Sequence, residues 1–99
     1  PREGDYREAK RAWEKFIEMS KLNYDLIVLD ELNIALFFGL LDPKDVINTL
    51  NELKNKMEIV VTGRYASREM LDIADLVTEM CQVKHYFEKG LGAREGIEF

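Results

Sequence analysis

The spacing of apolar and polar positions predicts helices and strands that follow one another along the chain. Between residues 5 and 21, apolar side chains recur every three or four positions, which predicts an amphipathic helix. Residues 26–29 and 57–62 are short apolar runs, typical of strands buried in a parallel sheet. The other predicted elements are helices over 32–40 and 43–54, a short helix after Ser67, a strand over 75–80 and a short edge strand over 97–99.

Three local signals mark where the helices begin and end. Asp42 followed by Pro43 is a helix start, with the carboxylate as N-cap and proline at the first helical position. Ser67 is predicted to cap the next helix in the same way. Gly39 is predicted to end the helix before Asp42, because glycine readily adopts the left-handed conformation.

Strands that alternate with helices predict an α/β fold with parallel pairing through right-handed crossovers. Residues 1–99 are predicted to form a single domain, since they contain no internal repeat, low-complexity stretch or linker. Hydrophobic residues make up 46% of the chain, enough for a core.

Charge and composition narrow the classes of function. A net charge of −5 argues against a general nucleic-acid or anionic-membrane binder, because both need a basic surface. No apolar stretch approaches the roughly 20 residues needed to span a bilayer. Cys81 is the single cysteine, which excludes an internal disulfide and fits a reducing cytoplasm.

Asp30 and Glu31 follow the apolar run Leu-Ile-Val-Leu directly. They stand at the carboxyl end of the predicted strand, where open α/β sheets bind their ligands. One interpretation is structural: Asp30 caps the following helix and Glu31 complements its dipole. The other is chemical, because paired carboxylates hold Mg²⁺ beside phosphates. The residues alone leave both open.

Arg64 follows the second strand, in Thr62-Gly63-Arg64. Parallel neighbours end at the same edge of a sheet, so Arg64 is predicted to lie near Asp30 and Glu31. Its guanidinium would bind a phosphate in a bidentate manner, or form a surface salt bridge with one of the two carboxylates.

Lys84 and His85, with Glu79, form a weaker candidate group. One histidine without a cysteine cluster is poor support for a metal site, so a structural or solvated role is the default. Cys81 is predicted to be an inert small hydrophobe, and Trp13 to be part of the core.

The phosphate-binding pattern Gly-x-x-x-x-Gly-Lys-[Ser/Thr] does not occur in these 99 residues. The chain nevertheless resembles one family of P-loop fold, the ATP:cob(I)alamin (corrinoid) adenosyltransferases, over almost its whole length. The resemblance is to the C-terminal portion of that family. It rests on five motifs in order: 24–33 (YDLIVLDELN), 60–64 (VVTGR), 74–80 (ADLVTEM), 83–85 (VKH) and 96–99 (GIEF).

The resemblance implies a partial RecA-like, mostly parallel sheet flanked by helices. In that topology the strands ending at Asp30 and Thr62 are neighbours. The phosphate-loop strand, absent here, lies between the Thr62 strand and the strand over 75–80. A gap of this kind would leave backbone groups unpaired, unless another segment fills it or the sheet has closed.

The resemblance also implies a reaction, in which cobalt(I) of cob(I)alamin attacks C5′ of ATP and tripolyphosphate leaves. On that basis Glu31 is expected to bind Mg²⁺ with Asp30 as its partner, Arg64 to contact phosphate, and Asn33 to help order the site; no catalytic residue is assigned. A cytoplasmic homodimer is expected, as for the family. Without the phosphate loop, we expect the chain alone to be inactive and to bind neither ATP nor Mg²⁺ appreciably. The alternative is a non-catalytic truncated relative that binds a corrinoid or a protein.

Overall fold

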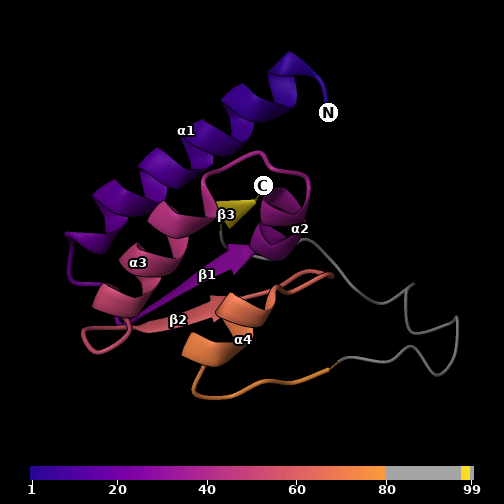
Figure 1. Cartoon of the computed structure of the whole chain (residues 1–99). Helices are drawn as coiled ribbons and strands as arrows, with labels where there is room; N and C mark the ends of the chain where they lie inside the picture. The colour runs from indigo at the N-terminus through magenta and orange to yellow at the C-terminus, as the bar shows by residue number, and fades with distance from the viewer. Residues whose placement is uncertain (80–96, 99) are drawn as a thin grey trace, which may run out of the picture.

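The computed structural model describes residues 1–79 and 97–98. Helices and strands alternate in these ranges, and the predicted α/β class is confirmed at this level (Figure 1). Within them no helix is long and apolar enough to cross a membrane. The elements are α1 (Glu3–Ser20), β1 (Leu26–Asp30), α2 (Leu32–Phe37), α3 (Pro43–Leu53), β2 (Glu58–Val61), α4 (Arg68–Ile73) and β3 (Ile97–Glu98).

The strands form a small parallel sheet in the order β2-β1-β3. The pair β1 and β2 is in register from Leu26 opposite Glu58 to Leu29 opposite Val61. The strand β3 pairs with the other side of β1 over two residues, which confirms the predicted edge strand for Ile97 and Glu98. Phe99 lies outside the described residues.

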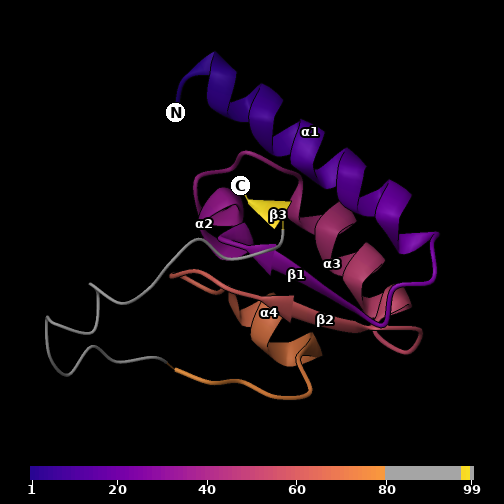
Figure 2. The same ribbon diagram turned by 180° about the vertical axis from the view of Figure 1, so that it is seen from behind.

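One face of the sheet carries the hydrophobic core. Ile27 and Leu29 point into it from β1, and they are 4% and 0% exposed. All the described helices supply buried side chains to the same side of the sheet, and α4 lies in front of β2 in Figure 1 and behind it in Figure 2. The buried cluster consists of Phe16, Ile27, Leu29, Leu32, Val46, Leu50 and Met70.

The predicted helix ends are confirmed by their backbone chemistry. The Asp42 carboxylate accepts a hydrogen bond from the Lys44 N–H at 3.0 Å, and the Ser67 hydroxyl accepts one from the Met70 N–H at 3.1 Å. Gly39 adopts φ 71° just after α2, in the left-handed conformation expected of a glycine that ends a helix.

The strand predicted over 75–80 is wrong for its described part. Residues 75–79 are not a strand, and Leu76 and Val77 are 84% and 56% exposed. A strand exists only where a neighbouring strand pairs with its backbone, and no described residue does so here. Met80 lies outside the described residues.

Candidate functional site

Parallel pairing brings the carboxyl ends of β1 and β2 to one edge of the sheet. Leu29 of β1 lies opposite Val61 of β2. The residues that come next along the sequence, Asp30 and Thr62, are therefore also neighbours. The prediction that these two strands are adjacent is therefore confirmed. Polar residues that the sequence separates by about thirty positions meet at this edge.

Thr62 is the centre of the polar network at the edge. Its hydroxyl donates a hydrogen bond to Oδ1 of Asp30 at 2.7 Å and accepts one from the Glu31 N–H at 3.0 Å. One hydroxyl thus fixes the carboxylate of Asp30 and the backbone of Glu31 together. The interpretation of Asp30 as a helix cap is wrong, because Asp30 is the last residue of β1 and its carboxylate bonds to Thr62.

Glu31 adopts an unusual backbone conformation, and Gly63 lies against it. Glu31 has φ 64°, in the left-handed region that few residues other than glycine enter. Gly63 has φ 115°, and a Cβ added to it would lie 3.1 Å from the Glu31 Cα. A side chain at position 63 would therefore be strained by this φ and crowded against Glu31, which favours glycine there. Strained residues of this kind cluster at functional sites.

Asn33 is buried beneath the same edge, with 6% of its surface exposed. Its backbone N–H donates to the Thr62 carbonyl at 3.4 Å, and its side-chain Nδ2 donates to the Gly63 carbonyl at 3.1 Å. Its side-chain oxygen Oδ1 has no partner among the described residues. Buried amide oxygens are nearly always hydrogen-bonded, so the unpaired Oδ1 points to a donor or cation that the described residues do not supply.

The oxygen atoms at this edge fit part of a Mg²⁺ site. Asp30 and Glu31 are half-buried, and a hard cation prefers such carboxylate oxygens. Among the described residues, no three acidic, histidine or cysteine side chains are grouped closely enough to hold a metal ion. Mg²⁺ can be held by one or two carboxylates, with water and phosphate as its other ligands.

Arg64 follows Gly63 in the loop and is exposed. The loop lies at the predicted edge, since Gly63 touches Glu31. The predicted alternative of a salt bridge to Asp30 or Glu31 is not observed. The single ion pair in the described part of the chain joins Lys54 and Asp75.

Two aromatic residues at this edge escaped the sequence analysis. Tyr65 has φ 64°, and its ring stacks on Phe37 from α2 with centroids 4.4 Å apart. Both rings are more than half exposed. They border an apolar hollow of about 790 Å³ between α2, the start of α3 and the loop before α4. The available signal was weak: Tyr65 follows the second predicted strand by three positions, and Phe37 lies in the helix predicted after the first.

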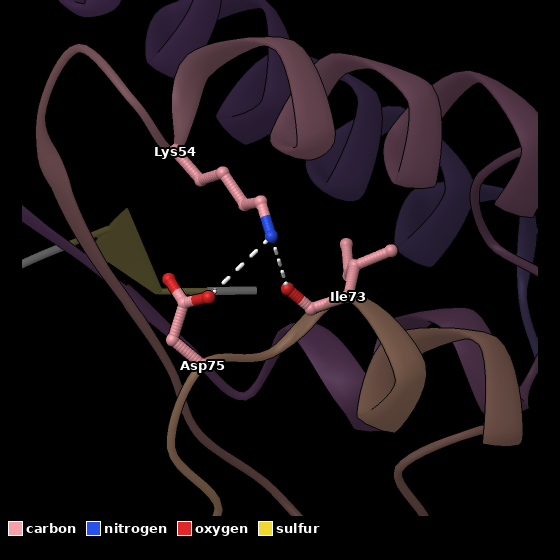
Figure 3. A network of polar contacts seen from close by, with 3 residues as sticks. All are labelled: Lys54, Ile73 and Asp75. Atoms are coloured by element: carbon pink, nitrogen blue, oxygen red, sulfur yellow. Dashed lines mark hydrogen bonds and ion pairs between the residues drawn. The ribbon is translucent and has the colours of Figure 1, made fainter.

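The ion pair of Lys54 anchors the helix that follows the loop (Figure 3). Lys54 Nζ donates to the Ile73 carbonyl at 3.1 Å and lies 3.5 Å from the Asp75 carboxylate. Ile73 ends α4, so a cation at the end of α3 holds the carbonyl end of α4. The helix after the Gly63 loop is thereby tied to the helix before β2.

The remaining candidates from the sequence divide into those that the structure describes and those that it does not. Lys84, His85 and Cys81 lie outside the described residues, and Glu79 is exposed. Trp13 is half-buried against the core, with its ring centroid 5.0 Å from that of Phe16, which confirms its predicted role.

Comparison with known proteins identifies the family. The family model for ATP:corrinoid adenosyltransferase BtuR/CobO/CobP matches residues 1–99. A corrinoid adenosyltransferase of Sinorhizobium sp. is 41% identical over 97 residues, which cover 96% of this chain and 45% of that protein. The corresponding proteins of Pseudomonas aeruginosa and Escherichia coli K12 are 40% and 32% identical over 99 residues, covering 49% and 50% of their lengths. The chain therefore belongs to the ATP:corrinoid adenosyltransferase family and spans about half the length of these curated relatives.

Proposed function

We propose that this chain forms the metal- and phosphate-facing part of an enzyme that transfers the 5′-deoxyadenosyl group of ATP to cob(I)alamin. The observation that carries the proposal is the network of Thr62 with Asp30 and Glu31. Asn33, whose side-chain oxygen is unpaired, is joined to this network through the Thr62 and Gly63 carbonyls. It gathers oxygen ligands at the edge where parallel sheets bind nucleotides.

The proposed reaction makes one bond and breaks one. Cobalt(I) donates an electron pair to C5′ of ATP, a cobalt–carbon bond forms, and the C5′–O bond breaks with its electrons passing to tripolyphosphate. Negative charge therefore grows on the phosphate oxygens. A Mg²⁺ ion bound there would offset this charge.

The residues of this chain have separate tasks in the proposal. Glu31 holds the metal ion, and Asp30, fixed by the Thr62 hydroxyl, supports it as a second oxygen donor. Asn33 anchors the Gly63 loop with its Nδ2. The exposed guanidinium of Arg64 is free to reach a phosphate, because it forms no ion pair with a described residue.

We further propose that the fold is the RecA-like type without its phosphate-loop strand, and that the complete enzyme is a cytoplasmic homodimer. Backbone N–H groups and a lysine of such a loop supply most of the binding of a triphosphate. The chain by itself should then show no ATP binding by titration calorimetry at about 1 mM ATP with Mg²⁺. A micromolar dissociation constant would contradict the proposal.

A chimera tests the positive part of the proposal. Joining the unmatched half of the Pseudomonas relative to this chain should give adenosyl transfer, measured from the absorbance change of the corrinoid. Glu31→Gln in the chimera should lower kcat by roughly 10²–10³-fold, the usual cost of losing a group that stabilises developing charge. The control Glu52→Gln, an exposed change on α3, should leave kcat unaltered. Equal activity of both variants would refute the role of Glu31, whereas a folded chimera without adenosyl transfer would favour a non-catalytic binding module.

A further inference from the structure

The loop after β2 lies along one face of α2 and is attached to it at two points. Asn33 donates its Nδ2 to the Gly63 carbonyl at 3.1 Å. One helical turn further along α2, the ring of Phe37 stacks on the ring of Tyr65, with centroids 4.4 Å apart and planes inclined by 28°. Because residues four apart in a helix are neighbours on its surface, both attachments come from the same face of α2.

The spacing of the two attachments matches the length of the loop. Four residues of an α-helix rise about 6 Å along its axis, and two residues of extended chain span at most about 7 Å. The step from Gly63 to Tyr65 can therefore follow the step from Asn33 to Phe37. Arg64 is the residue between the two attached positions, and it is exposed.

Tyr65 adopts a backbone conformation that its side chain disfavours. Its φ is 64°, in the left-handed region where a Cβ crowds its own backbone. Strained residues of this kind persist only where the surrounding structure fixes them. The stack on Phe37 supplies such a constraint. Phe37 itself stands on a fixed support, because Leu32 and Ala35 anchor α2 in the interior.

The attached loop also adjoins the carboxylate of Glu31. A Cβ added to Gly63 would lie 3.3 Å from Oε2 of Glu31, so this carboxylate lies against the residue that precedes Arg64. The side chains proposed to bind the metal ion and the phosphate therefore start from adjoining stretches of backbone. A fixed backbone at Arg64 limits the positions that its guanidinium can take relative to Glu31.

We propose that Phe37 and Tyr65 are positioning residues, whose ring stack fixes the Arg64 backbone on α2 and so presents the guanidinium to phosphate beside Glu31. The proposal rests on the proposed function in taking Arg64 to bind the triphosphate. A group fixed in advance needs no ordering during the reaction. A mobile Arg64 would have to be ordered each time ATP binds, which would weaken its effect on the developing charge.

Direct contact between the two rings and a substrate would be a different role. Both rings are more than half exposed and border the apolar hollow, so a ligand could reach them. The two roles differ in how they depend on Arg64. A ring that acts through Arg64 has no effect once Arg64 is removed, whereas a ring that touches substrate keeps its effect.

Backbone NMR relaxation of this chain, without ATP, metal or corrinoid, tests the attachment. The Arg64 amide should have an order parameter of about 0.85, the value of rigid backbone. Tyr65→Gly removes the ring and tolerates a positive φ. It should lower that value below about 0.6, and Phe37→Ala, which leaves the loop sequence unchanged, should do the same. Tyr65→Phe keeps the ring and should keep the rigid value. The matched control is Tyr24→Gly, which removes another exposed ring before β1 and should leave the Arg64 amide unchanged.

A double-mutant cycle in the chimera tests the consequence for the reaction. Tyr65→Gly alone should lower kcat/KM for ATP by about tenfold or more, as misplacement of a reacting group does. In the Arg64→Ala background, the same change should alter kcat/KM by less than about twofold. Tyr65→Phe and Tyr24→Gly should each leave kcat/KM close to that of the unchanged chimera.

The outcomes separate this proposal from the proposed function. A mobile Arg64 amide in the unchanged chain, or a rigid one in Tyr65→Gly, would overturn the proposal whatever the chimera does. An equal loss of kcat/KM from Tyr65→Gly in both backgrounds would also overturn it, and would assign the ring to direct contact with substrate. A folded chimera that transfers no adenosyl group contradicts the proposed function instead, and the order parameters alone then decide whether the rings fix Arg64.

Discussion

Replacing Thr62 with valine tests the central hydrogen bonds of the candidate site without changing the volume of the side chain. Valine keeps the β-branched shape of threonine and removes the hydroxyl. The loss leaves Oδ1 of Asp30 without its donor at 2.7 Å and the Glu31 N–H without its acceptor at 3.0 Å. No other described contact of the Thr62 side chain is polar, so the change isolates these two bonds.

The expected cost follows from the two bonds. A hydrogen bond to a charged group contributes about 1.5–3 kcal/mol and one between neutral groups about 0.5–1.5 kcal/mol. Asp30 and Glu31 are half-buried, so water can replace part of what is lost. We therefore expect Thr62→Val to lower the free energy of unfolding by about 2 kcal/mol, toward the low end of the sum.

Urea unfolding, followed by far-UV circular dichroism, measures the change. Thr62→Ser is the matched control, since it keeps the hydroxyl and removes one methyl group. It should lie within about 1 kcal/mol of the original chain, the transfer cost of one buried methyl. If the valine variant is as stable as the original, or the serine variant is as unstable as the valine variant, the hydroxyl does not fix the site.

Two other substitutions test the surroundings of the site. Gly63→Ala should destabilise the fold by about 1–3 kcal/mol, because φ 115° disfavours any side chain and the new Cβ would lie 3.1 Å from the Glu31 Cα; an unchanged urea midpoint would contradict this packing. Lys54→Met should cost about 1 kcal/mol through loss of the bond to the Ile73 carbonyl. Asp75→Asn should cost less than about 0.5 kcal/mol, because the Asp75 side chain is 84% exposed. If Lys54→Met and Asp75→Asn lower the free energy of unfolding equally, the ion pair, and not the bond to the Ile73 carbonyl, provides the stabilisation.

Helix ends were predictable because their chemistry is local. Asp42 needs only the N–H two residues later, and Ser67 only the one three residues later. The sequence contains both partners of each bond. Gly39 likewise acts through its own backbone freedom.

The strand predicted at 75–80 failed because a strand depends on a neighbour distant in sequence. Leu76 and Val77 have the apolar character of a buried strand, but no described segment pairs with them. Glu58 to Val61 has a similar pattern and forms a strand because β1 lies beside it. The same apolar pattern therefore gives different outcomes according to the partner.

The site was predictable in its location but not in its internal bonding. Parallel pairing alone places Asp30 near Thr62, and the sequence shows both strand ends. The Thr62 hydroxyl joins the two strand ends because its side chain points toward Asp30 and Glu31. The sequence does not reveal that orientation. The left-handed conformation of Glu31 has no sequence signal, since glutamate is not a residue that favours it.

The geometry of the site depends on the pairing of β1 with β2 rather than on any phosphate-binding element. Thr62 fixes Asp30 and Glu31, and the Gly63 carbonyl fixes the Asn33 amide. All five residues lie at the ends of these two strands or in the residues that follow them. A cluster built in this way keeps its arrangement wherever the two strands stay paired. The carboxylate part of the site can therefore be preorganised in a chain that spans about half the length of its relatives.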